Sequence, residues 1–595
     1  MTTAAWLDRH HTLERLGAER FDVLVIGGGI TGAGVARDAA LRGLRVALVE
    51  RDDFGAGTSS RSSRLVHGGV RYLEHGQLGL VFEASHERAL LLQLAPHLVR
   101  PMAFTWPVYR GARLPRWKLG VGLWLYDALA RFRNVGRHER LSAAQVLRRE
   151  PHLRADQLVG GASYWDAGTD DARLTLATAL AAAEAGASVA NHVAVTALRR
   201  SGGRVAGAVV TDRLTGTEHA VSANVVVNAT GPWADTILEL DGSGGQPAVR
   251  GTKGVHLLVS RERVGNTGAV TLVSVVDGRV MFVLPAGAFT IIGTTDTPTT
   301  MSPDEVRATH RAVAYLLQSA NAAFPDARLT ADDVISAWAG IRPLVASESA
   351  GSPASRSREH ELTWSASRLL TVTGGKLTTY RAMAADVVDG VVHELRRHAK
   401  EVTSHRVPLP GGDLGSLEGE RALATAATGD AAVGERLVHA YGSRWRRVWA
   451  LAAADPALAG RLSPGLPYLK AEAVHAATRE MACTLGDVLL RRTHLGFEAR
   501  DHGESALRAT TALLADALHW PLEVRRAQVA AYRAEVRRVF GDAVEFEDGH
   551  VTMSSPIGRA LIGKAVGDDV VLKLPAMTRR LTLVELATIH QATPE

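Results

Sequence analysis

The chain has 595 residues, of which 46% are hydrophobic and 22% are charged, and its formal net charge is +6. This composition is that of a soluble globular protein, and the length exceeds what one hydrophobic core supports, so about three domains are expected. Cys483 is the only cysteine, which excludes an intrachain disulfide and a cysteine-based metal site and fits a reducing compartment. No segment resembles a signal peptide or a membrane-spanning helix, so a cytoplasmic protein is predicted.

The first 50 residues predict a dinucleotide-binding unit. A short apolar strand, Phe21–Ile26, is followed at once by Gly27-x-Gly29-x-x-Gly32. The first glycine permits a tight turn, the second lets the backbone approach a pyrophosphate, and the third lets the following helix pack closely on the strand. The next predicted strand ends at Glu50, at the spacing expected for an acid that binds a ribose hydroxyl.

An apolar helix is predicted over Leu119–Ala130, directly after Arg116, Trp117 and Lys118. Twelve residues with Asp127 among them are too few to span a membrane. A basic and aromatic flank beside an apolar helix is typical of helices that lie on a membrane surface. A helix buried in the protein core explains the same pattern equally well. The mildly basic net charge permits contact with anionic lipids or substrates without demonstrating it.

Two later segments return to the nucleotide site and select its cofactor. A predicted strand ends in small residues at Ala229 and Gly231, which would let a flavin nucleotide approach the backbone. Another buried strand, Leu369–Gly375, leads into a polar turn that suits the pyrimidine edge of an isoalloxazine. The residues of this turn expected to bind the cofactor are Gly374, Gly375, Lys376, Leu377 and Thr378. A nicotinamide enzyme needs no such segment, so FAD is the predicted cofactor.

Several ordered motifs resemble the FAD-dependent, respiratory glycerol-3-phosphate dehydrogenases. They are VIGGGITGAG (25–34), GTSSRSSRLVHGGVRYLEH (57–75), DDARL (170–174), NATGPW (228–233), KGVH (253–256), IIGTTDT (291–297), GIRPL (340–344), GGKLTTYR (374–381) and TLGDVLLRRTHLG (484–496). The resemblance implies an α/β fold: a Rossmann-like FAD-binding domain of the glutathione-reductase type, a mixed-sheet substrate domain and a C-terminal helical domain.

We therefore expect a discontinuous FAD-binding domain at 1–75, 151–250 and 345–405, and a substrate-binding domain at 76–150 and 251–344. The proline- and glycine-rich stretch near 407–415 predicts a boundary before a helical domain at 416–540. The resemblance implies oxidation of sn-glycerol 3-phosphate to dihydroxyacetone phosphate, with hydride passing from C2 to flavin N5. It further implies electron transfer to a membrane quinone by an enzyme held peripherally at the inner face of the cell membrane.

The substrate phosphate calls for guanidinium groups, which bind phosphate bidentately and stay charged when desolvated. Arg71, Arg342 and Arg358 occupy the basic positions of the family pattern, although Arg358 lies in a polar stretch where a solvated charge is an alternative. His256 is expected to be the general base, because imidazole titrates near neutral pH. Arg342 could instead stabilise the developing alkoxide or the reduced flavin.

The remaining predicted site residues surround these groups. Tyr72 and Lys376 are expected to form part of the site wall. His67 lies in a glycine-flanked turn, where it contacts the isoalloxazine or caps the backbone. Small hydroxyls at Thr58, Ser59 and Ser60 suit a loop that passes the pyrophosphate, although the same residues are common in ordinary turns.

Two segments outside these motifs stand apart. Residues 443–449, SRWRRVW, mix cations and indoles as membrane-surface or nucleic-acid binders do, but a solvated helix face with buried tryptophans is the more common reading. Residues 548–575 resemble the C-terminal domain of Gre-type transcription factors, within a β-like tail at 543–595. The acidic coiled coil of that family has no counterpart here, so nucleic-acid binding is not expected and an RNA polymerase contact is speculative.

Three alternatives remain from the sequence. A glycerophosphate oxidase would pass the electrons to oxygen and release peroxide. An amine or amino-acid oxidase also needs arginine for a carboxylate, although the HGGVRYLEH and GIRPL contexts argue against it. A flavoprotein scaffold would use the tail to report redox state. A homodimer is possible, and no cysteine- or histidine-rich spacing predicts a metal.

Overall fold

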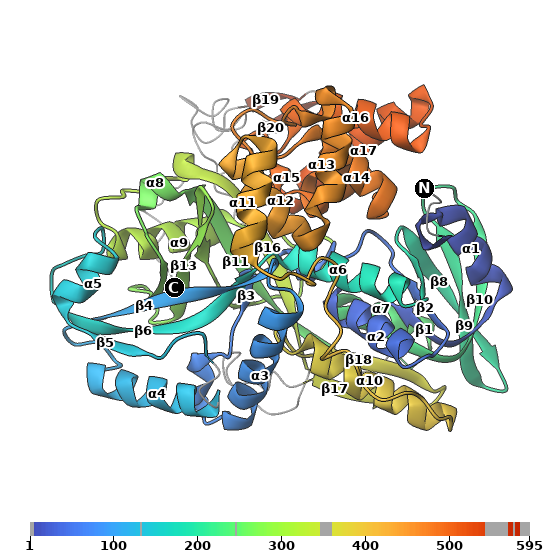
Figure 1. Ribbon diagram of the computed structural model, residues 1–595, viewed down its shortest axis with the longest axis horizontal. Coiled ribbons are helices and arrows are strands. Elements are labelled where there is room, and N and C mark those ends of the chain that lie inside the picture. The colour runs from blue at the N-terminus through green and yellow to red at the C-terminus, as the bar shows by residue number, and fades with distance from the viewer. Residues whose placement is uncertain are drawn as a thin grey trace.

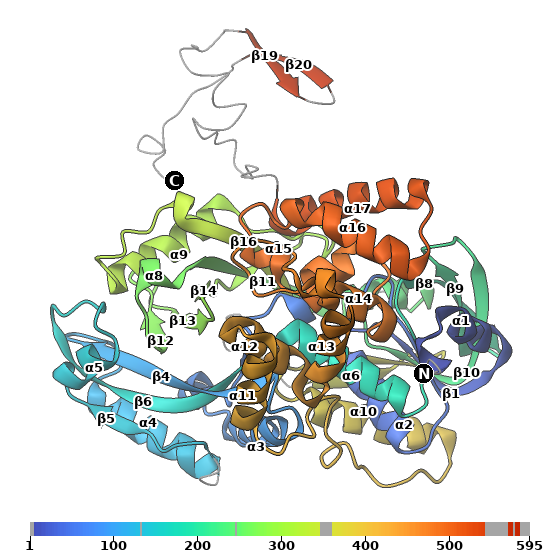
Figure 2. The ribbon, with the colours of Figure 1, turned by 45° about the horizontal axis from the view of Figure 1, so that its top comes forward.

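The computed structural model of the chain describes residues 5–130, 134–243, 247–345, 360–541, 569–574 and 577–582. An eight-stranded and a ten-stranded sheet form two adjoining halves of the molecule. A group of helices from the last third of the chain lies across their junction (Figures 1 and 2). This arrangement confirms the predicted α/β fold with its C-terminal helical domain.

The first sheet has the order β17-β18-β10-β1-β2-β7 and is parallel from β18 to β7. Strand β1 is buried on both faces, because Val23 and Val25 share an apolar core with α2, α6 and α10 while Phe21, Leu24 and Ile26 belong to a second apolar core. Strands β8 and β9 extend the sheet from β10. The strands are β1 (Arg20–Ile26), β2 (Val46–Val49), β7 (Ser188–Ala190), β8 (Val193–Ser201), β9 (Arg204–Asp212), β10 (Glu218–Asn228), β17 (His360–Trp364) and β18 (Leu369–Gly374).

The second sheet has the order β15-β11-β14-β13-β12-β4-β6-β3, with β16 paired to β11 and β5 paired to β6. The antiparallel register of β11 and β16 sets His256 opposite Trp338 and Thr252 opposite Arg342. The strands are β3 (Leu65–Val66), β4 (Val99–Tyr109), β5 (Glu139–Leu141), β6 (Leu158–Thr169), β11 (Val249–Ser260), β12 (Ala269–Val273), β13 (Val280–Ala286), β14 (Phe289–Gly293), β15 (Thr297–Pro298) and β16 (Val334–Val345).

Helices of the first 400 residues cover the two sheets. They are α1 (Arg9–Ala18), α2 (Ile30–Leu41), α3 (Leu78–Leu94), α4 (Arg116–Leu129), α5 (Ala143–Arg149), α6 (Asp171–Glu184), α7 (Ala234–Leu240), α8 (Arg261–Val264), α9 (His310–Ala323) and α10 (Tyr380–Leu395). Strand β6 belongs to the second sheet, although our sequence-based boundaries put residues 158–169 in the nucleotide domain. An isolated strand pattern carries no information about which sheet it joins.

The C-terminal domain is helical, as expected from its composition. Its helices are α11 (Leu417–Thr428), α12 (Ala431–Tyr441), α13 (Trp445–Ala454), α14 (Lys470–Arg479), α15 (Leu495–Glu498), α16 (Glu504–Leu518) and α17 (Leu522–Phe540), with a π-helical turn at Asp487–Arg492. In the tail, β19 (Asp569–Leu574) and β20 (Met577–Thr582) form an antiparallel hairpin. The rest of the tail lies outside the described residues.

The structure shows which face of helix α4 is buried and which is exposed. Leu119 and Leu123 are buried in the core, whereas Trp117, Val121 and Trp124 are 56–63% exposed. One face of the helix is therefore buried in the core, while the other is an exposed apolar stripe, and contact of that stripe with a membrane stays a prediction. Among the described residues, no helix has the length and apolar character needed to cross a membrane.

Candidate active site

A cavity of about 350 Å³ lies where the carboxyl ends of the first sheet's strands meet β11 and β16 of the second sheet. Ligands of open α/β sheets bind at this edge. Most of the predicted site residues line it: Gly27, Gly29, Glu50, Thr58, Ser59, His67, Tyr72, Ala229, Gly231, His256, Arg342, Gly374, Gly375, Lys376, Leu377 and Thr378. Segments that lie far apart in the sequence thus converge on one cavity.

The glycine turn is built for a closely approaching ligand. Gly27 has φ of +106°, and a Cβ there would lie 2.7 Å from the carbonyl oxygen of Ala229. Gly32 does not line the cavity; a Cβ on it would lie 1.9 Å from the oxygen of Gly27. The third glycine therefore serves the packing role predicted for it, bringing the N-terminus of α2 against the turn. Such a terminus favours a phosphate charge.

The carboxylate of Glu50 closes the same end of the cavity. Its Oε2 accepts a hydrogen bond of 2.6 Å from the backbone N–H of Gly28, and its Oε1 accepts one of 2.8 Å from that of Asp52. Burial raises the pKa of Glu50, while these two backbone bonds act in the opposite direction. Each carboxylate oxygen retains a lone pair that can accept a ribose hydroxyl.

The three hydroxyls predicted near the pyrophosphate have different roles. Ser59 Oγ accepts a bond of 3.0 Å from the N–H of Ile30 at the start of α2, and Thr58 Oγ1 donates to the carbonyl of Ile341 at 2.6 Å. Ser60 is buried, bonds only within its own turn to Gly57, and is not part of the cavity lining. The 3₁₀ turn thus places Ser60 beside the cavity lining and not in it, and a contact of Ser60 with the cofactor stays a prediction.

The turn after β18 closes the opposite end of the cavity. Gly374 and Gly375 have φ of +74° and +80°. The Thr378 hydroxyl accepts from the N–H of His67 at 3.1 Å and bonds its carbonyl at 3.3 Å. The ammonium of Lys376 lies 3.8 Å from the ring centroid of Tyr72. Tyr72 and Lys376 thus form one wall, and the hydroxyl of Thr378 fixes the backbone of the His67 turn.

His256 is held rigidly beside this wall. Its ring stacks on Trp338, its cross-strand neighbour, at a centroid distance of 5.5 Å, and its Nε2 shares a bond of 2.8 Å with Ser63 Oγ. Gly293 of β14 leaves room for the imidazole, since a Cβ there would lie 2.3 Å from His256 Cδ2. Burial and the charges of Arg342 and Arg64 lower the pKa of His256 to about 3, so the ring is neutral at physiological pH.

Arg342 is oriented by three groups on the loop after β14. Nη1 donates to Asp296 Oδ1 at 3.0 Å, Nη2 donates to Thr294 Oγ1 at 3.0 Å, and both nitrogens reach the carbonyl of Thr295. The guanidinium packs over Gly254, where a Cβ would lie 2.5 Å from Nη2. A positive charge is therefore fixed in position in the same cavity as a neutral imidazole.

Sequence reasoning missed two basic residues of the cavity, Arg51 and Arg61. Arg61 is 8% exposed, and its guanidinium forms no hydrogen bond or ion pair with another described residue. Burial lowers the pKa of Arg61 to about 10, so it stays charged and suits an anionic group of a dinucleotide. The SSRSSR run contains it but does not indicate which arginine is buried. Of the other predicted cations, Arg71 lies in the 3₁₀ turn Val70–His75 without a described side chain, and Arg358 lies outside the described residues.

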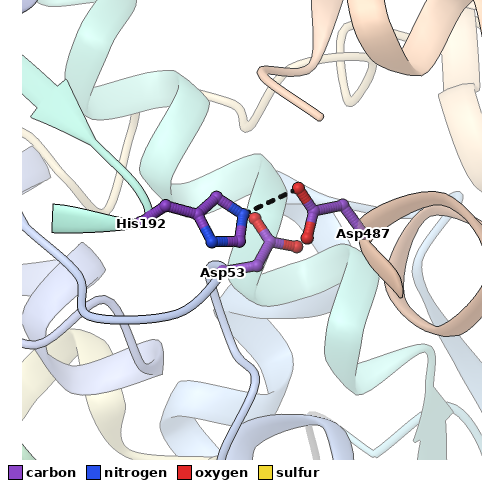
Figure 3. A group of neighbouring side chains, drawn as sticks. All are labelled: Asp53, His192 and Asp487. Carbon is purple, nitrogen blue, oxygen red and sulfur yellow. Dashed lines mark hydrogen bonds and ion pairs between the residues drawn. The ribbon is translucent and has the colours of Figure 1, made fainter. Parts of the chain in front are cut away.

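A second buried cluster has the spacing of a metal site without its chemistry. Asp53, His192 and Asp487 bring ligand atoms within 4.8 Å of one another (Figure 3). The Asp53 carboxylate is already bound by Arg491 and Arg492, and Asp487 accepts from His192 at 2.9 Å and from Arg491 at 2.9 Å. The guanidinium groups supply the balancing charge, so this cluster joins the nucleotide domain to the C-terminal domain as an ion network.

Comparison with known proteins gives the class and then the family. A family model described as FAD dependent oxidoreductase matches residues 22–381. The glycine turn from Gly27 to Gly32, the buried Arg61 and the cavity that they adjoin fit FAD as the cofactor. The chain is an FAD-dependent oxidoreductase. It is 40% identical over 575 residues to glycerol-3-phosphate dehydrogenase 2 of Mycobacterium bovis, covering 93% of this chain and 95% of that protein. It therefore belongs to the glycerol-3-phosphate dehydrogenase family.

Other relatives agree with this assignment. Glycerol-3-phosphate dehydrogenase of Synechocystis is 37% identical, with 86% of this chain and 95% of that protein covered. The crystal structure of glycerol-3-phosphate dehydrogenase from Bacillus halodurans, complexed with FAD, matches with a TM-score of 0.76 at 33% identity, covering 92% of this chain and 100% of that one. Residues 402–525 match the C-terminal domain of alpha-glycerophosphate oxidase, and residues 533–588 match the C-terminal domain of transcription elongation factors GreA and GreB.

Proposed function

We propose that this protein oxidises sn-glycerol 3-phosphate to dihydroxyacetone phosphate, as the names of its relatives suggest. The observation that carries the proposal is the convergence of a dinucleotide cradle, a neutral imidazole and a fixed guanidinium on one cavity. FAD, when bound, supplies the acceptor for the hydride that leaves C2. The residues of the chain bind the phosphate, orient the substrate and remove the hydroxyl proton.

His256 takes the proton of the C2 hydroxyl. A general base must be unprotonated, and burial together with the charge of Arg342 holds the pKa of His256 near 3. A base with so low a pKa is weak in the free protein. A bound phosphate dianion would offset the charge of Arg342 and raise the basicity of the ring when substrate is present. The Trp338 stack and the Ser63 bond keep the ring aligned for this transfer.

Arg342 supplies the positive charge that the substrate requires. In this proposal it stabilises the negative charge that develops on the C2 oxygen, since Asp296 and Thr294 fix its guanidinium in the same cavity as His256. Preorganised charge of this kind is worth about 3 kcal/mol or more of the barrier in a site that excludes water. Lys376 and Tyr72 shape the adjoining wall, and Arg71 and Arg358 remain the proposed phosphate ligands.

We further propose that the electrons pass to a membrane quinone and that the α4 stripe contacts the lipid surface at the inner face of the cell membrane. Trp117, Val121 and Trp124 recur at helical spacing on one exposed face, and the exposed Arg116 and Lys118 flank them. Indoles and cations in this arrangement suit the headgroup region of anionic lipids.

The membrane part of the proposal is tested by sedimentation with vesicles containing anionic phosphatidylglycerol. Trp117→Ser/Trp124→Ser should weaken vesicle binding by about tenfold or more, since two buried indoles each contribute over 1 kcal/mol. Equal sedimentation of this variant and the wild type would rule out the α4 stripe as the contact. Turnover with a soluble acceptor serves as the folding control.

A glycerophosphate oxidase remains the second candidate, and the match of residues 402–525 to an alpha-glycerophosphate oxidase domain is the observation that favours it. The two functions differ in the electron acceptor. Turnover with sn-glycerol 3-phosphate in air should yield less than one peroxide per ten dihydroxyacetone phosphates when a quinone analogue is present. Stoichiometric peroxide would assign the oxidase. No product with either acceptor would reject both, and would leave the scaffold reading.

The tail is proposed to be an accessory of the enzyme. Residues 533–588 match a Gre-factor domain, and the hairpin of β19 and β20 is the part of 543–595 that the structure describes. Deletion of residues 543–595 should leave turnover within about twofold, because none of the cavity lining belongs to this segment. A loss of turnover in the truncated protein would give the tail a role in the reaction.

A further inference from the structure

A second cavity, of about 120 Å³, lies between the nucleotide domain and the C-terminal helices and shares no lining residue with the cofactor cavity. Helix α6 forms one side of it through Ala177 and Leu180, and helices α12 to α14 form the other side. Trp6 and Leu7 from the start of the chain also line it. The proposed reaction uses none of these residues.

The lining of this cavity has an excess of positive charge. Arg173, Arg444, Arg447 and Arg479 line it together with the carboxylates Glu184 and Glu480. Each carboxylate is already bound by one guanidinium through two hydrogen bonds: Glu480 by Arg173 at 2.7 and 2.8 Å, and Glu184 by Arg444 at 2.5 and 2.9 Å. Arg447 and Arg479 therefore remain as the excess charge, which is formally +2.

These two arginines have no acidic partner within the described part of the chain. No described carboxylate lies within salt-bridge distance of Arg447 or Arg479. Arg447 lies on α13 and is exposed, whereas Arg479 ends α14 and is half-buried, and both line the cavity. Their like charges repel one another, and an anion bound to both would reduce that repulsion.

A buried imidazole adds a further unused polar group. His475 lines the cavity, is 5% exposed and makes no hydrogen bond to any described residue. Its ring packs edge-on against Tyr441 at a centroid distance of 5.2 Å. The ring nitrogens of His475 are not among the fully buried side-chain atoms that lack a partner, so they are accessible from the cavity, where a ligand can bond to them.

We infer that this interdomain cavity binds a small phosphate dianion. The excess charge of the lining matches that of the ligand, guanidinium groups bind phosphate oxygens bidentately, and the imidazole of His475 supplies a further N–H. The volume accommodates one phosphate and a short carbon fragment against the apolar side formed by Ala177, Leu180 and Leu7. The proposed ligands of the anion lie on α13 and α14, and α6 packs over the anion with Ala177 and Leu180.

Helix α6 also connects this site to the cofactor cavity. The helix begins at Asp171, whose Oδ2 accepts a hydrogen bond of 2.7 Å from the hydroxyl of Ser62, a residue of the cofactor cavity. Arg173, two residues further on, holds Glu480 of the C-terminal domain. The phosphate site therefore lies on the helix whose first residue supports the active-site wall.

The test counts phosphate bound to the FAD-loaded, full-length protein by equilibrium dialysis against radiolabelled inorganic phosphate. The variants are compared in an Arg342→Ala background, in which any phosphate that the proposed ligands Arg71 and Arg358 hold in the cofactor cavity is common to all of them. The interdomain cavity should add one phosphate per chain, and Arg447→Gln/Arg479→Gln should weaken that added binding at least about tenfold, because charge-assisted bonds from two arginines are lost. Neither arginine has an acidic partner among the described residues, so the double substitution breaks no ion pair there. Flavin content and Tm are measured to check that the variant folds.

A matched control removes the same charge elsewhere in the domain. Arg508 and Arg526 are exposed and lie outside the cavity lining, so Arg508→Gln/Arg526→Gln should leave phosphate binding unchanged. Equal binding by the Arg447/Arg479 variant and its background would overturn the inference, as would an equal loss in the control. A third outcome is that Arg342→Ala leaves phosphate binding unchanged while Arg447→Gln/Arg479→Gln reduces it. This result would support the interdomain site and would count only against a phosphate-binding role for Arg342.

Discussion

The position of Arg342 can be changed without altering Arg342 itself. Gly254 lies beneath its guanidinium on β11, and a methyl group at this position would lie 2.5 Å from Nη2, 2.8 Å from Cζ and 2.8 Å from Thr294 Oγ1. Normal contacts of a Cβ begin near 3.4 Å. Gly254→Ala must therefore displace the guanidinium by about 1 Å and break its bonds to Thr294 and Asp296.

A displacement of this size in a catalytic group lowers the rate by about 10²-fold, equivalent to about 2.7 kcal/mol of transition-state stabilisation. We expect Gly254→Ala to lower kcat/KM for sn-glycerol 3-phosphate by this factor with little loss of bound flavin. Glu50 and the glycine turn adjoin strands of the first sheet, whereas Gly254 lies on β11 of the second sheet.

The assay is steady-state reduction of a soluble quinone analogue by the FAD-loaded protein. Gly79→Ala is the matched control, because a methyl group at Gly79 meets no atom within 4 Å. The decisive comparison is with Arg342→Ala: the double variant should be no slower than Arg342→Ala alone, since the methyl group acts through the guanidinium. Normal kcat/KM in Gly254→Ala, or additive losses in the double variant, would refute this reasoning.

Three further predictions concern the proposed general base His256, the glycine turn at Gly32 and the stability of the protein in acid. His256→Asn should lower kcat by about 10²–10⁴-fold with unchanged flavin content, measured by single-turnover flavin reduction; a smaller loss would assign the proton transfer to another group. Gly32→Ala should weaken FAD binding by more than about tenfold, because the new methyl group would lie 1.9 Å from the Gly27 oxygen. Fluorescence titration of the apoprotein with FAD measures this affinity, and a wild-type affinity would contradict the predicted packing role. Burial and the charge of Arg173 lower the pKa of His97 to about 3. Between about pH 6.5 and 3 the unfolded state therefore binds a proton on His97 that the folded state does not bind. The free energy of unfolding should fall with falling pH by up to about 1.4 kcal/mol per pH unit. His97→Gln should reduce that slope in urea unfolding between pH 6.5 and 4.5, and an unchanged slope would show that His97 is not buried as a neutral ring.

The parts of the fold that the sequence predicts best are local in the chain. The strand, glycine turn, helix and terminal acid from Phe21 to Glu50 follow one another directly, so steric and charge rules are sufficient to place them. The small residues at Ala229 and Gly374 could be brought to the same site because strands of a parallel sheet end at one edge.

The groups that sequence could not predict depend on register and burial. The stacking of Trp338 on His256 follows from the pairing of β11 with β16, two strands separated by many residues that contain no turn signal linking them. Arg61 and Arg64 are alike in the SSRSSR run, and only packing determines that Arg61 lines the cavity while Arg64 lies over Trp338. The same limit applies to Ser60, whose burial the sequence does not indicate.

Helix α4 illustrates a different limit. Its composition indicates an apolar helix with a basic flank, which suits both a buried helix and a membrane-surface helix. Burial of Leu119 and exposure of Trp124 separate the two faces, a distinction that depends on which side meets β6 and α3.

The central claim is tested most directly by anaerobic mixing of the FAD-loaded protein with sn-glycerol 3-phosphate while the flavin absorbance near ~450 nm is recorded. We predict rapid bleaching that is absent with glycerol and strongly slowed by Arg342→Ala, followed by reoxidation on addition of a quinone analogue. A flavin that stays oxidised with sn-glycerol 3-phosphate would contradict the proposed reaction.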